Sequence, residues 1–233
     1  MFSENLRESL DLSLFWEYRA ILLAGLRFNF YVFALAGIVA VVLGFGACLL
    51  RIARARPLRA VGGLYAELFR NCPEFVLLIW VYYVPPLLVG LAVGHKIAFP
   101  PLAAAVAALG LAYSGYFAES FRAGIEAVPK GHVEAALALG MRGGLIMRRI
   151  VLPQAVRQML PELMNQLVSL FKATTLVSLI AVPDLLYNVS MVVQQEMKPL
   201  PLYTGAALVY CVLVIAFSLL VRAAAERWRT RYL

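Results

Sequence analysis

The chain has 233 residues, of which 63% are hydrophobic and 15% are charged, and its formal net charge is +8. Soluble globular domains average about 45–50% apolar and about 25% charged residues, so this composition excludes an ordinary soluble protein and indicates a membrane protein. Three cysteines, far apart and without a CxxC pair, indicate neither a disulfide framework nor a metal site.

The segment 1–27 precedes the first long apolar run. It carries acidic residues and has no basic region ahead of an apolar core, so a cleavable secretory signal is not expected. We predict that residues 1–27 form an external or interfacial segment, and that the first membrane helix acts as its own insertion signal.

Five apolar runs predict an all-α, polytopic membrane protein with five transmembrane helices. The first, 28–50, is uncharged and as a helix reaches roughly 34 Å, enough to cross a hydrocarbon core. A pair of prolines, Pro85 and Pro86, is expected to break or kink the second helix near its outer end. The other four runs lie at about 68–93, 102–118, 160–182 and 202–221.

The first helix also carries small residues at every fourth position. No hydrophobic effect drives helices together in lipid, and small residues let a neighbouring helix approach closely. One face of this helix is therefore expected to pack against another helix through Ala36, Ala40, Gly44 and Cys48.

Arginine and lysine are distributed unevenly over this topology, and the positive-inside rule puts the N-terminus outside and the C-terminus in the cytoplasm. Residues 28–222 then form the transmembrane domain, 122–157 a cytoplasmic loop between the third and fourth helices, and 223–233 a cytoplasmic basic tail. No nucleic acid is needed to explain the charge. The cytoplasmic set is Arg51, Arg54, Arg56, Arg59, Arg122, Lys130, Arg142, Arg148, Arg149, Arg157, Arg222, Arg227, Arg229 and Arg231, and the outside keeps Arg7, Arg19, Arg27, Lys96 and Lys198.

The cytoplasmic loop contains the stretch EAALALGMRGGLIMRRIVLPQA, which is neither a membrane span nor an ordinary amphipathic helix. Residues 134–139 favour a helix, Gly140 and then the pair at 143–144 interrupt it, and Pro153 ends or restarts the helix that follows. Two short helices joined at a corner could lie in a groove of another protein. A membrane-surface amphipathic helix fits the same residues equally well.

A resemblance decides between these two interpretations. The spacing Glu134-Ala135-Ala136, three residues, Gly140, nine residues, Ile150, one residue, Leu152-Pro153 resembles the EAA loop of importer-type ABC transporter permeases. The flanking stretches FRNCPEFVLLIWVYYVPP, AESFRAGIEAVPKGHVEAALALG and LVSLFKATTLVSLIAVPDLL are similar to the polar amino acid permease subfamily. The resemblance covers roughly 22–220 and implies a multi-pass permease of the bacterial inner membrane.

The resemblance implies that the energy comes from a partner. The chain contains no GxxxxGK[ST] phosphate loop, so we expect no catalytic residue and no cofactor in this chain, with ATP and Mg²⁺ bound by an ABC ATPase dimer. The EAA loop would be the coupling helix that docks into a cleft on that ATPase. The residues expected to make this contact are Glu134, Ala135, Ala136, Gly140, Gly143, Arg148, Ile150, Leu152 and Pro153.

Within that segment the glycines are expected to permit a tight corner, and the two alanines to keep the docking face thin. Glu134 is expected to pair with an ATPase arginine or to cap the first short helix. The resemblance also implies a second permease subunit, identical or similar, and a periplasmic or lipid-tethered amino-acid-binding protein that delivers the substrate.

The fourth helix supplies the candidate substrate pathway. Ionisable groups at membrane depth are costly and usually functional, and Lys172 lies near the middle of this run, on one helical face with Asn165 and Ser169 and beside Thr175. The α-carboxylate or an acidic side chain of an amino acid would suit this lysine. An internal ion pair explains Lys172 equally well; its partner would be Glu67, Glu74 or Glu119.

Two departures from the subfamily pattern concern the substrate. Ala173 stands where an acidic or amide residue commonly follows the lysine, and Asn71-Cys72-Pro73 stands where Gly-Thr-Pro is common, which makes Asn71 a further pathway candidate. A more positive pathway favours glutamate or aspartate. Glu119 and Arg122, three residues apart, are expected to form a helix-end pair, and Tyr113 and Tyr116 to pack.

Other classes of protein fit less well. A secondary transporter typically has more spans and internal repeats, and none is visible in the sequence. A channel subunit would need a filter or a charge ring. An enzyme is the least favoured class, because His95 and His132 fall in loops on opposite sides of the membrane and no catalytic motif accompanies them. A secondary transporter or a channel subunit for a small polar solute is therefore the alternative.

Overall fold

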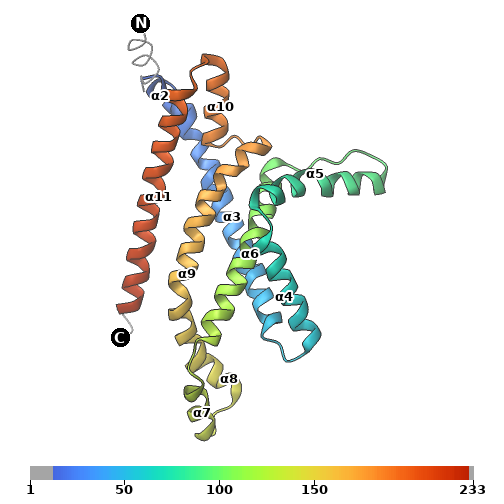
Figure 1. Cartoon of the computed structure of the whole chain (residues 1–233), viewed down its shortest axis with the longest axis vertical. Helices are drawn as coiled ribbons and strands as arrows, with labels where there is room; N and C mark the ends of the chain where they lie inside the picture. The colour runs from blue at the N-terminus through green and yellow to red at the C-terminus, as the bar shows by residue number, and fades with distance from the viewer. Residues whose placement is uncertain (1–12, 231–233) are drawn as a thin grey trace. The chain divides into compact units, whose positions relative to one another are not determined.

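The computed structural model describes residues 13–230, and their backbone is helical almost throughout, without a strand (Figure 1). This confirms the predicted all-α class. The elements in chain order are α2 (Ser13–Glu17), α3 (Arg19–Arg51), α4 (Arg56–Asn71), α5 (Glu74–Val93), α6 (Pro101–Glu126), α7 (Lys130–Ala138), α8 (Gly143–Ile146), the π-helical turn η1 (Met147–Val151), α9 (Leu152–Ala173), the 3₁₀ segment η2 (Thr174–Ile180), α10 (Leu185–Glu196) and α11 (Pro199–Thr230).

Five helical stretches are long and apolar enough to cross a membrane, which confirms the predicted number. Most extend beyond the apolar runs, because a helix continues past the edge of the hydrocarbon core. The boundaries predicted at 27/28 and 222/223 accordingly fall inside α3 and α11. The five stretches are Arg19–Arg51, Glu74–Val93, Pro101–Glu126, Gly143–Ile180 and Pro199–Ala223.

The second span differs from its prediction in two respects. Its first residues belong to a separate helix, α4, because Pro73 holds the preceding Cys72 in an extended conformation, with φ −77° and ψ 125°. The break expected at Pro85 and Pro86 is wrong, since α5 continues through both prolines. Membrane helices tolerate proline when the freed carbonyl groups find other partners.

The chain divides into two compact units. Unit 1 comprises Met1–Gly37, Glu74–Leu109 and Leu170–Phe217, and unit 2 comprises Ile38–Pro73, Gly110–Ser169 and Ser218–Leu233. Several long helices contribute one part to each unit, so each unit is built from segments that are far apart in the sequence.

Unit 1 is held together by apolar side chains of α3, α10 and α11, with Leu22, Leu185 and Leu202 fully buried at the centre. A second contact is aromatic, because the ring of Phe33 lies 5.6 Å from that of Phe171 and 5.2 Å from that of Phe217. Edge-to-face arrangements of this kind are favourable beyond the area that they bury.

Unit 2 is packed through small residues, as the stripe on the first helix predicts. A Cβ atom on Gly44 would lie 2.7 Å from Cβ of Phe117 and 2.9 Å from the backbone oxygen of Ser114, so only glycine permits this approach of α3 and α6. Ala40 and Cys48 are fully buried one turn to either side. The predicted packing face is therefore confirmed for this part of α3.

Candidate functional site

Residues 130–153, called the corner segment below, form a helical hairpin within unit 2. The helix α7 ends in a Schellman motif in which Gly140 takes φ +75°, the N–H of Met141 donates to the oxygen of Ala136 at 3.1 Å, and the N–H of Gly140 donates to that of Leu137 at 2.9 Å. The expected interruption at Gly140 is confirmed. Gly143 and Gly144 do not interrupt a helix, since they begin α8.

The hairpin joins α9 through the π turn. Pro153 has no N–H and cannot bond the carbonyl of Arg149 four residues earlier, and the N–H of Leu152 donates to Met147, five residues back. Such π turns are rare overall, and those that occur often lie at functional sites. Pro153 thus neither ends the helix nor starts a separate one; it accompanies a wider turn at the first residues of α9.

The interior of the corner segment is apolar and includes one of the expected docking residues. Ala136 is buried with Ile146, Val151 and Ala155, and the half-buried Ile150 packs against them. Ala136 therefore lets α7 approach the start of α9, which corrects the expectation that both alanines face a partner.

The remaining docking candidates lie on the outside of the corner segment. Glu134, Ala135 and Gly140 are exposed on the α7 side, and Gly143, Arg148, Leu152 and Pro153 on the other. Glu134 does not cap α7. The N-cap position is Pro129, and no side-chain hydrogen bond caps the helix there.

The sequence reasoning missed four exposed apolar side chains around the corner. Leu139, beside Gly140, is 81% exposed, and Leu137, Leu145 and Met147 are at least 40% exposed. A groove of about 540 Å³ runs between α7 and η1, lined by Leu137, Met147 and neighbouring residues, with Lys130 and Glu134 at its rim. Leucines on both sides of the glycines in a segment too short and too basic to span a membrane are the signal that could have indicated this surface.

Lys172 is exposed at the last turn of α9, and within the described residues it forms no ion pair. Asn165 and Ser169 share its helical face, seven and three residues before it. Thr175 follows in η2 and donates its hydroxyl to the backbone oxygen of Lys172 at 2.9 Å. Lys172 and Thr175 belong to unit 1, and Asn165 and Ser169 to unit 2.

Among the described residues, no ion pair joins Lys172 to Glu67, Glu74 or Glu119, the partners considered for it. Glu67 pairs with Arg70, and Glu119 pairs with Arg51 and Arg122. Asn71, the fifth pathway candidate, lies in unit 2 at the end of α4, where its amide donates to the backbone and side-chain oxygens of Glu67, both at 2.8 Å. Asn71 thus completes a polar helix end.

Glu119 is the centre of a charged cluster in unit 2. Its carboxylate lies 2.5 Å from the guanidinium of Arg51 on α3, 2.5 Å from that of Arg122 on its own helix, and 4.0 Å from that of Arg70 on α4. The predicted pair with Arg122 is confirmed, and two further arginines come from other helices. Glu119 therefore joins three arginines, of which Arg70 also pairs with Glu67 and Arg122 with Glu126.

A second polar cluster lies in unit 1 and was missed from the sequence. Asn29 of α3, Thr174 of η2 and Asp184 at the start of α10 are fully buried, and the amide of Asn29 donates to both of the others. Tyr210 of α11 donates its hydroxyl to Asp184 at 3.3 Å. Asp184 also caps α10 by accepting the N–H of Tyr187 at 2.8 Å. Burial raises the pKa of Asp184 to about 6, against the hydrogen bonds from Tyr187, Asn29 and Tyr210, which lower it.

Asp184 should make the fold more stable in weak acid than at neutral pH. Its folded pKa of about 6 exceeds the ordinary 3.8, so the stabilisation by the bound proton is complete below the ordinary value and is lost as the pH rises through about 6. The facing side chains are Asn29, Thr174 and Tyr210, of which only Tyr210 is titratable, and a phenol stays protonated here.

The effect amounts to at most about 3 kcal/mol for a shift of roughly two units. The measurement compares the thermal midpoint of the wild-type chain with that of Asp184→Asn between about pH 4.5 and 7.5, where the amide stands for the protonated acid. The thermal midpoint of Asp184→Asn should rise relative to that of the wild type as the pH increases towards 7.5. A difference independent of pH would contradict the buried carboxylate.

Known proteins are similar to this chain in sequence and in fold. The family model of the inner membrane component of binding-protein-dependent transport systems matches residues 36–230. The chain belongs to this family. The arginine transport system permease protein ArtQ of Bacillus subtilis is 30% identical over 95% of this chain and 99% of its own length, and the probable glutamine ABC transporter permease protein GlnM of the same organism is 33% identical over 88% and 93%. The resemblance to ABC importer permeases is confirmed.

Solved structures agree with this assignment. A crystal structure of an amino acid ABC transporter with histidines superposes with a TM-score of 0.85 at 29% identity, over 93% of this chain and 98% of that chain. The methionine transporter MetNI, in an inward-facing conformation, shares the fold with a TM-score of 0.70 at 18% identity. Family membership also makes this permease a multi-pass protein of the inner membrane and a membrane component rather than an ATPase.

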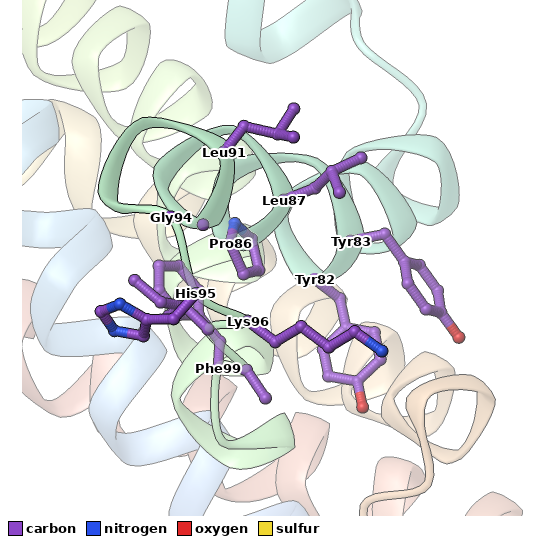
Figure 2. A pocket seen from close by; sticks show the side chains of 12 residues that line it. Tyr82, Tyr83, Pro86, Leu87, Leu91, Gly94, His95, Lys96 and Phe99 are labelled. Atoms are coloured by element: carbon purple, nitrogen blue, oxygen red, sulfur yellow. The ribbon is translucent and has the colours of Figure 1, made fainter.

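The permease has a further groove, of about 700 Å³, that contains none of the predicted pathway residues. It lies in unit 1 between the end of α5 and the loop that follows, with Tyr82 and Leu87 on the helix and His95 and Lys96 on the loop (Figure 2). Gly90 permits the close approach of this loop, since a Cβ there would lie 2.9 Å from the oxygen of His95. Its lining is mostly apolar.

Proposed function

We propose that this permease moves an amino acid across the bacterial inner membrane as part of an ATP-driven importer, and that its corner segment binds the ATPase. The observation that carries the second part is the exposed outside of the corner segment, where Leu139 is 81% exposed and the carboxylate of Glu134, earlier in the same arm, is also exposed. An exposed leucine and an exposed charge on one arm suit a groove in a partner protein, because burying the leucine supplies affinity and the charge supplies orientation. The other exposed candidates of the corner segment are Ala135, Gly143, Arg148, Leu152 and Pro153.

The substrate class rests on relatives and on Lys172. The relatives named above are permeases for arginine and glutamine, and another Bacillus subtilis relative, at 31% identity, is an L-cystine permease. These substrates share the α-amino acid group and differ in side-chain charge. An exposed lysine without an internal partner, followed by Ala173, supports a carboxylate ligand, and glutamate or aspartate is the proposed substrate.

The assembly that we propose contains an ATPase dimer, a second permease subunit of the same or a similar sequence, and a periplasmic or lipid-tethered amino-acid-binding protein. ATP and Mg²⁺ bind to the ATPase. The start of α3 faces the periplasm, and the corner segment and the end of α11 face the cytoplasm, as the arginine distribution favours. Residues 1–12 and 231–233 of the predicted terminal segments lie outside the described residues.

Charge reversal and an apolar-to-acidic change in the corner segment test the docking surface. Glu134→Lys and Leu139→Asp should each lower co-purification of the ATPase at least about tenfold, because a wrong charge or a buried carboxylate at an interface costs several kcal/mol. The two side chains are exposed, so the permease itself should keep its expression level and thermal midpoint.

Lys96→Glu is the matched control, since it reverses an exposed charge in the loop after α5, outside the corner segment. It should leave the ATPase bound. Wild-type association and uptake in both corner variants would show that this segment is not the docking site, and the membrane-surface interpretation would replace it.

A further inference from the structure

We propose that Asn29 and Asp184 are positioning residues for transport, because they hold the segment η2 and thereby the direction in which Lys172 and Thr175 face the substrate. This inference rests on the proposed function of Lys172 in the pathway. All four residues belong to unit 1.

The side-chain amide of Asn29 is the centre of the cluster. Its nitrogen donates to the backbone oxygen of Thr174 at 3.3 Å, to the hydroxyl of Thr174 at 3.2 Å and to the carboxylate of Asp184 at 3.1 Å. Its oxygen accepts the N–H of Leu185 and the hydroxyl of Tyr210, both at 3.4 Å. One side chain of α3 thus bonds to η2, α10 and α11.

The first residues of α10 fit closely against α3 at this point. A Cβ atom on Gly25 would lie 2.5 Å from the backbone carbon of Asp184 and from the nitrogen of Leu185, so glycine allows the two backbones to touch. Asp184 itself is bonded by Asn29, Tyr210 and the N–H of Tyr187. Both ends of the turn after η2 are therefore fixed to α3.

The cluster acts where α9 changes into the 3₁₀ segment. Thr174 is the first residue of η2 and the second after Lys172, and its hydroxyl donates to the oxygen of Phe171 at 2.7 Å. At this change of helix type the backbone oxygens of Phe171 and Lys172 accept the hydroxyls of Thr174 and Thr175, and Asn29 donates to the hydroxyl and the backbone oxygen of Thr174. The place where α9 ends, and with it the direction of Lys172, follows from these bonds.

A polar cluster of this kind does more than add stability. Apolar side chains of similar volume often stabilise a protein at least as well as buried polar groups, whereas a network in which every member is bonded allows only one arrangement. The fully bonded network around Asn29 is therefore suited to fix the geometry of η2. The helices α5 and α10 also lie against η2, but proximity alone does not select one arrangement.

The test uses the complete importer in proteoliposomes and an exchange of the two side chains. Asn29→Asp removes the donor from Thr174. The double variant Asn29→Asp with Asp184→Asn restores an amide-to-carboxylate bond between the two positions and still removes the side-chain donor that position 29 gives to the hydroxyl and backbone oxygen of Thr174. We expect the double variant to recover most of the thermal midpoint lost in Asn29→Asp, while both variants move roughly tenfold less amino acid per ATP hydrolysed.

Tyr18→Phe is the matched control, because it removes another long-range bond of unit 1, the 2.6 Å bond from Tyr18 to Glu196, which involves neither η2 nor α9. It should lower the midpoint slightly and leave transport per ATP unchanged. Normal transport per ATP in the double variant would show that the cluster only stabilises the fold and would overturn the inference.

A second readout separates this inference from the proposed function. In a chain with Cys48, Cys72 and Cys211 replaced by alanine, the rate of alkylation of Thr175→Cys reports the position of that side chain without transport. Asn29→Asp should change this rate at least about threefold, and an unchanged rate would overturn the inference even if transport fell. Absence of amino acid uptake by the wild-type importer would overturn the proposed function alone.

Discussion

Replacing Lys172 by alanine should reduce ATP-dependent uptake of the amino acid roughly a hundredfold, while the importer still assembles. Removing one partner of a desolvated charge pair costs about 2–5 kcal/mol, and Lys172, near the end of the fourth span, is exposed and forms no ion pair among the described residues. Uptake of labelled glutamate in proteoliposomes and co-purification of the ATPase measure the two quantities.

Lys172→Arg and Lys198→Ala are the controls for this result. The first keeps the positive charge and should retain part of the uptake, and the second removes an exposed lysine outside the spans and should retain all of it. A glutamate-specific loss, with neutral amino acids still transported, would support an acidic substrate. Wild-type uptake by Lys172→Ala would remove Lys172 from the pathway.

Replacing Glu119 by glutamine should lower the free energy of unfolding by about 2 to 3 kcal/mol. Breaking a buried ion pair typically costs 3–5 kcal/mol because the remaining charge has no partner. We expect a smaller loss here because the side chain of Glu119 is 26% exposed. Arg51 would then lose its ion pair, whereas Arg70 keeps Glu67 and Arg122 keeps Glu126. The thermal midpoint of the detergent-purified permease measures the change.

Glu126→Gln gives the comparison, since Glu126 also pairs with Arg122 but is 56% exposed. A pair at that exposure contributes less than about 1 kcal/mol. Equal losses in the two variants would mean that the position of Glu119 between three helices adds no stability. Solvent would then already screen the charges of the arginines around it.

The features that follow from local patterns could be predicted from the sequence. Apolar runs gave the five spans, since length and composition alone decide whether a helix can cross a bilayer. The corner at Gly140 follows from the ability of glycine to take a positive φ after a helix. The pair of Glu119 and Arg122 follows from their spacing of three residues on one helix.

The features that depend on distant residues could not be predicted. Asn29 and Asp184 are 155 residues apart, and nothing near either of them indicates that the other is its partner. The burial of Ala136 depends on Val151 and Ala155, which approach it only because the corner turns the chain back. Alanine is compatible with a surface and with a tight interior, so the residue type alone does not choose.

The π turn between α8 and α9 also sets the rotational phase of the fourth span. A π turn takes in about one residue more than an α turn, so the residues of α9 are rotated by about 100°, the angle of one α-helical residue, from where an uninterrupted helix would place them. Deleting one residue of Met147–Val151 would convert the turn into ordinary helix and leave Asn165 and Ser169 pointing as they do. A one-residue deletion within α9, ahead of Asn165, would instead rotate Asn165 and Ser169 by about a quarter of a turn. The direction of this face therefore withstands the loss of a residue in the π turn but not in α9.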